Sequence, residues 1–166
     1  MKQVLIFGAG TVARPAVGYL LEKEGVEVVV ADQDPGKAEA LVAGHPGGRA
    51  VALDAGDAPM LERTISAADI VVSLLPWTLH PVIAELCLAH GKHMITASYV
   101  KEEMQAMDRE ARDKGLIFLN EVGVDPGLDH MSAMQIIDAV RAEGGRRQDS
   151  QAKGRSFRRD SVLRSP

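Results

Sequence analysis

The sequence predicts an α/β fold, a doubly wound parallel sheet with helices on both faces, and three observations support this class. Short apolar runs alternate with segments of helical apolar spacing along residues 1–145. A glycine-rich turn joins the first apolar run to the first helical segment. The apolar runs lack polar alternation, which is typical of strands buried on both faces of a parallel sheet. Regular alternation of such strands with helices favours parallel pairing through crossover connections.

Each expected element has a local reason. The strands combine β-branched and aliphatic residues, and the helices carry apolar residues three or four positions apart. Gly25 ends the first helix, and Pro35 opens the second because its fixed φ suits a first helical turn. Strands are expected at residues 3–7, 27–31, 50–53, 69–73, 93–96 and 116–119, and helices at residues 11–24, 35–43, 58–66, 81–90, 101–114 and 128–143.

Composition narrows the class of protein. The single cysteine, Cys87, excludes an internal disulfide and a multi-cysteine metal site, and its apolar neighbours predict a buried thiol. No segment approaches the roughly 18 apolar residues of a membrane span. The net charge of −4 gives no reason to expect nucleic acid as a partner. These features fit a cytoplasmic globular protein.

Charge divides the chain near Gly144 and Gly145. Residues 146–166 contain 7 basic and 2 acidic side chains, which gives this segment a net charge of +5. Because the whole chain has a net charge of −4, residues 1–145 have a net charge of −9. The segment after the glycines has few large hydrophobic residues and no apolar period. We therefore expect a folded domain at residues 1–145 and a disordered or aberrant basic tail at residues 146–166, with polyanion binding by the tail as an alternative.

The segment FGAGTVARP indicates a nucleotide-binding turn. Gly8 and Gly10 occupy the first two glycine positions of the dinucleotide fingerprint, and Ala13 occupies the third. The first glycine permits the tight turn, the second lets a pyrophosphate approach the backbone, and the small third residue lets the helix pack against the strand. Unpaired N–H groups at the helix N-terminus then face the phosphates. We expect a Rossmann-type domain in which the pyrophosphate of NAD(P) lies over Gly8 and Gly10.

Asp32, at the end of the second expected strand, bears on the choice of cofactor. An acid at this position accepts hydrogen bonds from the hydroxyls of the adenosine ribose. Its carboxylate would repel a 2′-phosphate, so Asp32 favours NAD(H) over NADP(H). The alternative is a solvated acid in the turn sequence DQDPG, and the neighbouring Gln33 and Lys37 could weaken the discrimination.

Three further loops follow the third, fourth and fifth strands and are expected at the carboxyl ends of the sheet, where ligands bind in such folds. They contain Asp54 and Ala55, then Leu75, Pro76 and Trp77, then Ser98 and Tyr99. Pro76 suits a backbone that passes around a ligand, whereas Trp77 is expected to cover the sheet edge. Ser98 could cap a helix. Tyr99 has no evident core role in a polar loop, which favours a ligand contact.

The segment NEVGVDPGLDHMSAM follows the sixth strand and lies on the same expected side. Pro126 and Gly127 predict a turn, and Asp129 is expected to cap the last helix. Asp125 precedes the proline and is expected to point into the cleft. His80 and His130 lie near these loops but have no Cys or carboxylate partners at metal-ligand spacing, so no metal site is predicted.

Together, FGAGTVARP, SLLPWTLHP, TASYV and NEVGVDPGLDHMSAM resemble the saccharopine dehydrogenase/reductase family, in matching order from residue 2 to about residue 145. The resemblance implies a Rossmann domain followed by a substrate-binding α/β domain. It also implies oxidation or formation of saccharopine, the secondary amine that joins glutamate to 2-aminoadipate 6-semialdehyde in lysine metabolism. Fungal members tend to carry an arginine suited to NADP where this chain has Asp32, which leaves the usual NADPH assignment open.

Site residues also follow from the resemblance. It implies that Ser98 and Tyr99 hold the amino-acid substrate. The cofactor would contact residues 9–12, Asp54, Ala55, Leu75, Val124, Asp125 and Pro126. The chemistry would be hydride transfer between nicotinamide and a C–N carbon, with the hydride supplied by the cofactor. Asp125 is a candidate for orienting substrate or cofactor, and the catalytic proton-transfer residue is not identified.

This chain is shorter than the family members it resembles, in which a substrate domain would follow the position of residue 145. A truncated or frame-shifted product, lacking the substrate domain and inactive as an enzyme, is the first explanation expected from the sequence. The alternative is a stand-alone NAD(H)-binding module that acts as a redox sensor or as one subunit of a split enzyme. A homodimer is left open, since a face lacking its second domain could associate.

Overall fold

The computed structural model describes residues 1–143. The basic segment at residues 146–166 and the expected boundary at residue 145 lie outside the described residues, so both stay predictions. Within the described part, the alternation of strands and helices expected from the sequence is present.

The six strands form one parallel sheet in the order β3-β2-β1-β4-β5-β6. From β1 the chain adds β2 and β3 on one side, and then β4, β5 and β6 on the other, so the strand order reverses between β1 and β4. In such sheets ligands bind in the crevice outside the carboxyl ends of the two strands at this reversal. This confirms the doubly wound class. The strands are β1 (Lys2–Phe7), β2 (Val26–Asp32), β3 (Gly48–Ala52), β4 (Ile70–Ser73), β5 (His93–Thr96) and β6 (Phe118–Leu119).

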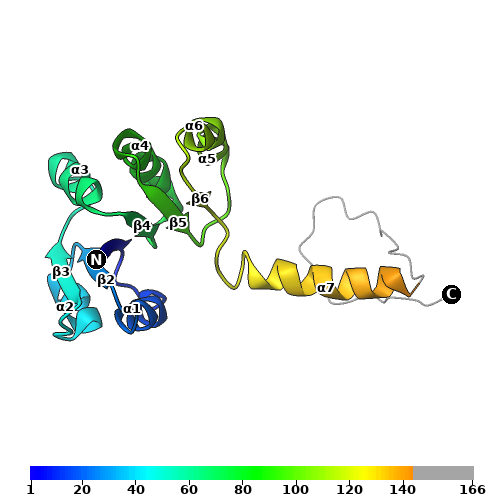
Figure 1. The fold of residues 1–166 in the computed structure, drawn as a ribbon, viewed down its shortest axis with the longest axis horizontal. Helices are drawn as coiled ribbons and strands as arrows, with labels where there is room; N and C mark the ends of the chain where they lie inside the picture. Colours follow the sequence, from blue (N-terminus) through cyan, green and yellow to red (C-terminus); the bar gives the residue numbers. More distant parts are fainter. Residues whose placement is uncertain (144–166) are drawn as a thin grey trace.

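Helices cover both faces of the sheet, with α1 and α2 on one face and α3 to α6 on the other (Figure 1). Alternate residues of β1 supply the two cores. Val4 and Ile6 pack in one buried cluster, Leu5 and Phe7 in the other. Each fully buried aliphatic side chain contributes about 1.5–3 kcal/mol. The helices are α1 (Ala13–Leu21), α2 (Pro35–Val42), α3 (Ala58–Ala67), α4 (His80–His90), α5 (Glu102–Ala106), α6 (Asp108–Asp113) and α7 (Leu128–Ala142), and a 3-10 turn (Trp77–Leu79) precedes α4.

Several element boundaries differ from expectation, and three of the differences are the following. The helix expected at residues 101–114 is two helices that meet at Met107, and nothing in the local sequence marks the break. The first helix begins at Ala13, not Thr11, because residues 10–12 form the turn that Ala13 N–H closes on the Gly10 carbonyl, 3.0 Å away. The sixth strand shortens to Phe118–Leu119, the two residues that pair with Met94 and Ile95 of β5.

Helix α7 projects away from the sheet (Figure 1), and none of its residues is buried. Four of its large apolar side chains are exposed, namely Leu128, Met131, Met134 and Ile136, and Ile137 is half-buried. A contiguous exposed apolar surface commonly marks an interaction face. Among the described helices, none combines the length and apolar character needed to cross a bilayer.

Candidate functional site

The glycine turn between β1 and α1 has the shape that a pyrophosphate requires. Gly8 has φ +96°, and a Cβ there would lie 3.1 Å from the carbonyl oxygen of Leu74. A Cβ built on Gly10 would meet nothing within 4 Å, so the space above this residue is open. Ala13 is fully buried beneath the turn. Each of the three positions therefore meets the physical demand that the sequence fingerprint places on it.

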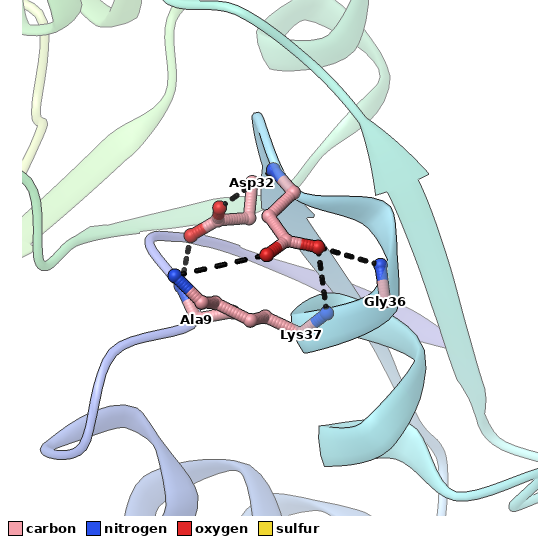
Figure 2. Close-up of polar contacts among 5 residues, drawn as sticks. Ala9, Asp32, Gly36 and Lys37 are labelled. Atoms are coloured by element: carbon pink, nitrogen blue, oxygen red, sulfur yellow. Dashed lines mark hydrogen bonds and ion pairs between the residues drawn. The ribbon is translucent and has the colours of Figure 1, made fainter.

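Asp32 lies beside this turn and binds its backbone (Figure 2). The N–H of Ala9 donates to Asp32 Oδ2 at 2.7 Å, and the N–H of Asp34 donates to Asp32 Oδ1 at 2.9 Å. The side chain of Asp34 instead caps α2, accepting from Gly36 N–H at 3.0 Å and Lys37 N–H at 3.3 Å. The two carboxylates have different tasks: Asp34 starts the helix, and Asp32 connects the end of β2 to the glycine turn.

A cleft of about 400 Å³ opens at the carboxyl ends of β4 and β5. Six residues predicted from the sequence line it: Val12, Leu75, Ser98, Tyr99, Asp125 and Pro126. A smaller hollow of about 230 Å³, between β3 and α3, contains none of the predicted residues. The cleft thus joins the start of α1, the two central strand ends and the segment after β6.

The remaining predicted residues lie outside the cleft wall. Asp54 Oδ1 accepts the Gly56 N–H at 2.9 Å, so this carboxylate stabilises its own turn next to Ala55. Val124 is 73% exposed, and Pro76 is exposed at the start of the 3-10 turn. Residues of the glycine turn and the end of β2 form a separate group beside the cleft: Gly8, Ala9, Gly10, Thr11, Asp32 and Gln33.

Tyr99 and Asp125 meet across the cleft wall, although 26 positions separate them. The Tyr99 hydroxyl donates to Asp125 Oδ1 at 2.5 Å. This hydrogen bond is the main reason that the pKa of Tyr99 rises to about 12, with the negative charges of Asp125, Asp129 and Glu121 adding to it. Tyr99 is therefore a protonated donor at neutral pH, and Asp125 faces the cleft as the sequence predicted.

Two other expectations about this region need correction. Asp129 is not the N-cap of α7: that position is Gly127, and Asp129, inside the first turn, accepts the Gly127 N–H at 3.0 Å. Trp77 is 53% exposed and lines the cleft, with Lys101 Nζ 5.2 Å from its ring centre, instead of covering the sheet edge. The 3-10 turn after Pro76 places the indole there.

A buried histidine was not identified as a site residue from the sequence. His80 is 2% exposed, and its ring contacts three hydroxyl groups that line the cleft. Nδ1 lies 3.0 Å from Ser73 Oγ, and Nε2 lies 3.0 Å from Thr96 Oγ1 and 2.8 Å from Ser98 Oγ. Four segments meet at this ring: the ends of β4 and β5, the loop after β5 and the start of α4.

Burial lowers the pKa of His80 below its ordinary value, and this predicts a pH effect on stability. The unfolded chain binds the proton more readily than the folded chain, so the free energy of unfolding should increase with pH between the folded pKa and about 6.5. Above that window His80 should add no pH dependence. The measurement is urea unfolding as a function of pH, combined with NMR titration of the His80 ring. A His80 pKa above the ordinary value would contradict this prediction.

Within residues 1–143, the structure shows no metal site and no activated cysteine nucleophile. The part of the chain that the structure describes holds no group of three or more His, Cys, Asp or Glu side chains able to hold a metal ion. Cys87 is fully buried, as predicted, and burial raises the pKa of its thiol to about 12. A thiol with so high a pKa is a poor nucleophile at neutral pH.

Comparisons with known proteins agree with this geometry. A family model described as the saccharopine dehydrogenase NADP-binding domain matches residues 4–119. The saccharopine dehydrogenase [NADP(+), L-glutamate-forming] of Schizosaccharomyces pombe is 39% identical over 146 residues, which cover 88% of this chain and 32% of that protein. The mitochondrial alpha-aminoadipic semialdehyde synthase of Bos taurus is 36% identical, and the match covers 86% of this chain and 15% of that protein.

Solved structures extend the comparison. The apo saccharopine dehydrogenase (L-Glu forming) of Saccharomyces cerevisiae superposes with a TM-score of 0.79 at 33% identity, covering 88% of this chain and 33% of that one. A biliverdin reductase from Synechocystis, solved with biliverdin and NADP+, shares the fold at a TM-score of 0.63 and 19% identity. The chain spans about a third of the length of the saccharopine dehydrogenases it matches.

Proposed function

Because this chain belongs to the saccharopine dehydrogenase NADP-binding domain family, we propose that it is the nucleotide-binding part of an oxidoreductase acting on saccharopine or a related carboxyalkyl amine. Hydride would pass between nicotinamide and the C–N carbon, and the cofactor supplies that hydride when bound. The observation that carries the proposal is the glycine turn, with open space above Gly10 and a close backbone contact at Gly8.

The bound dinucleotide would extend from the glycine turn into the cleft. Its pyrophosphate would lie over Gly10, where free N–H groups at the start of α1 favour negative charge. The adenosine would lie toward Asp32, and the nicotinamide toward Val12 and Leu75. In this proposal the cofactor residues are Gly8, Ala9, Gly10, Thr11, Val12, Asp32, Gln33, Asp54, Ala55, Leu75, Pro76, Val124, Asp125 and Pro126.

Ser98 and Tyr99 are the proposed contacts of the amino-acid substrate. Both line the cleft, and Tyr99 reaches Asp125, which would orient substrate or carboxamide through this hydrogen bond. Ser98 can offer its hydroxyl hydrogen to a carboxylate oxygen of the substrate, whereas the Tyr99 hydroxyl gives its one hydrogen to Asp125 and would meet the substrate with its oxygen. A cytoplasmic location and a homodimer stay predictions, because the described residues test neither.

The choice between NAD(H) and NADP(H) is a finer proposal. The family model is that of an NADP-binding domain, and the fungal saccharopine dehydrogenases among the relatives carry NADP(+) in their names. Here two carboxylates, Asp32 and Asp34, follow β2, and Lys37 Nζ already pairs with Asp34 Oδ2 at 3.7 Å. A 2′-phosphate would bring more negative charge to this place. We infer a preference for NAD(H), with NADP(H) as the alternative.

Titration of the purified chain with both reduced cofactors tests this inference. NADH should bind about tenfold or more tightly than NADPH, a difference of roughly 1.4 kcal/mol. Asp32→Ala should narrow that ratio several-fold, since it removes both the acceptor for ribose hydroxyls and the charge that repels phosphate. Tighter binding of NADPH by the unchanged chain would overturn the preference.

Two variants separate charge from structure in this test. Asp32→Asn removes the charge and keeps one oxygen for the Ala9 N–H, although it loses the bond from the Asp34 N–H, so it should narrow the ratio while retaining the contact with the glycine turn. Asp34→Asn is the matched control, because asparagine caps a helix about as well as aspartate. A ratio that responds to Asp34→Asn as strongly as to Asp32→Asn would mean that general charge, and not a contact at Asp32, sets the preference.

A further inference from the structure

Among residues 1–143, two lysine side chains lie over aromatic rings, and one of these pairs lines the cleft. Lys101 Nζ is 5.2 Å from the centre of the Trp77 ring, and Lys23 Nζ is 4.1 Å from the centre of the Tyr19 ring. Both distances are short enough for attraction between an ammonium group and the face of a ring. Lys101 and Trp77 line the cleft, whereas Lys23 and Tyr19 do not. The Lys101–Trp77 pair is therefore placed to contact a ligand there.

Lys101 occupies a position where lysine is not expected to stabilise the local structure. It is the N-cap of α5, and its side chain makes no capping hydrogen bond. Serine, threonine, aspartate and asparagine are favoured at this position because their side chains accept N–H groups of the first turn. A positive charge is also unfavourable at the start of a helix, where the next residues, Glu102 and Glu103, fit better. Residues that break a local rule in this way are often found at functional sites.

The ammonium group of Lys101 also has no acidic partner in the part of the chain that the structure describes. Three other lysines, Lys2, Lys37 and Lys114, pair with carboxylates there at 3.3, 3.7 and 2.7 Å. Lys101 takes part in none of the ion pairs of residues 1–143. The face of a ring attracts a cation without neutralising its charge. The charge of Lys101 therefore remains available to an anion in the cleft.

Trp77 is expected to hold this charge in place. The ring lies in the 3-10 turn after β4 and the lysine in the loop after β5, so two neighbouring strands bring them together. A free lysine side chain samples many rotamers, and ordering it costs binding free energy. Contact with the indole favours the rotamers that keep Nζ at the cleft wall. A ligand then has less of this ordering to do.

We propose that Lys101, held against Trp77, binds a carboxylate group of the ligand and makes the cleft selective for anionic over neutral ligands. That this ligand is the amino-acid substrate rests on the proposed function; the anion site itself does not. Ser98 lines the same cleft and can donate its hydroxyl hydrogen to a carboxylate. Lys101 thus adds a charged contact to the hydroxyl contact already proposed for the substrate.

Titration of the 166-residue chain with glutarate, a small dicarboxylate, tests the proposal. Trp77 is the single tryptophan, so its indole N–H gives one signal in a ¹H–¹⁵N spectrum. Glutarate should shift this signal and the Ser98 amide in a saturable way, and added salt should weaken the binding. Glutaramide, the uncharged diamide of equal length, should bind about fivefold more weakly or not at all. Equal affinity for the two compounds, or no saturable shift with glutarate, would overturn the proposal.

Substitution of Lys101 separates its charge from the fold. Lys101→Ser removes the ammonium group and supplies a favoured N-cap, so the melting temperature should stay equal or rise. The same variant should bind glutarate about fivefold more weakly and with less dependence on salt. Lys101→Arg keeps the charge and should retain both properties. Unchanged glutarate affinity in folded Lys101→Ser would contradict the assignment.

Lys23→Ser is the matched control for this variant. It removes the same charge from the other lysine–aromatic pair, outside the cleft, and should leave glutarate binding unchanged. If Lys23→Ser weakened binding as much as Lys101→Ser, the net charge of the chain and not a contact at Lys101 would explain the effect, and the proposal would be wrong.

Titration with NADH distinguishes a carboxylate from a phosphate of the dinucleotide as the partner of Lys101. Lys101→Ser should leave the NADH affinity unchanged, because the pyrophosphate is proposed to lie over Gly10. An equal loss of NADH and glutarate affinity would assign Lys101 to the cofactor and overturn the proposal. The Gly10 amide reports separately on the proposed function. If glutarate binding depends on Lys101 while Gly10 does not respond to NADH, the anion site stands and the dinucleotide site is wrong.

Discussion

Gly10→Val should abolish dinucleotide binding while leaving the domain folded. The space above Gly10 is open, and no atom would lie within 4 Å of an added Cβ, so the fold can accept the side chain. That same space is where the pyrophosphate must approach the backbone. Two branched methyl groups would fill it. We expect affinity to fall by about 100-fold or more, a loss of at least roughly 2.7 kcal/mol.

The measurement is a fluorescence or calorimetric titration with NADH, with circular dichroism to establish that the variant is folded. Gly18→Val is the matched control. Gly18 lies in α1, and a Cβ built there would also meet nothing within 4 Å. Valine costs less than glycine in a helix interior, so this control should fold at least as well, and its affinity should be unchanged. Normal binding by folded Gly10→Val would place the cofactor elsewhere.

The glycine turn could be predicted because each of its requirements is local. The φ of Gly8, the open space at Gly10 and the burial of Ala13 all follow from one strand–turn–helix unit. Asp32 was predictable for the same reason, since it ends the next strand. What could not be read locally is that the N–H of Ala9 donates to Asp32, a contact between residues 23 positions apart.

The His80 group shows what local patterns miss. Its members come from four segments, and none of their spacings resembles a known motif. One signal was present: Ser73 and Thr96 each follow two or more apolar residues at the end of a strand, and these two strands are neighbours in a doubly wound sheet. Polar groups buried at such positions need partners. The histidine that supplies the partner could be identified only once the start of α4 was placed above the sheet.

Helix α7 shows a different limit. The apolar spacing at residues 128–143 predicts a helix, and the helix forms. The spacing cannot show what the apolar side chains pack against, and within the described residues four of the large ones remain exposed. A chain that matches only 32% of the S. pombe relative does not contain most of the surface present in that protein.

The 166-residue chain alone should bind dinucleotide but turn over no saccharopine. Hydride transfer needs the amine held in near-attack geometry with water excluded, and orientation alone can contribute about 7–11 kcal/mol to lowering a barrier. Here the cleft walls are open to solvent, with Tyr99 50% and Trp77 53% exposed. Among residues 1–143, Lys101 is the one basic side chain that lines the cleft. One cation and the hydroxyls of Ser98 and Tyr99 are too few to fix a ligand with several carboxylates.

The assay follows reduced-nicotinamide absorbance with saccharopine and either NAD+ or NADP+, alongside a binding titration of the same sample. We expect a measurable dissociation constant and no turnover above the buffer rate. Each 1.4 kcal/mol of lost orientation slows the reaction about tenfold, so losing half of the orientation effect would already reduce the rate by several powers of ten. Turnover by this chain would contradict the prediction. It would mean that residues beyond 143, or a second copy of the chain, complete the pocket around Ser98 and Tyr99. Binding without turnover would instead indicate that the missing orientation comes from the part of the longer relatives that the match does not cover.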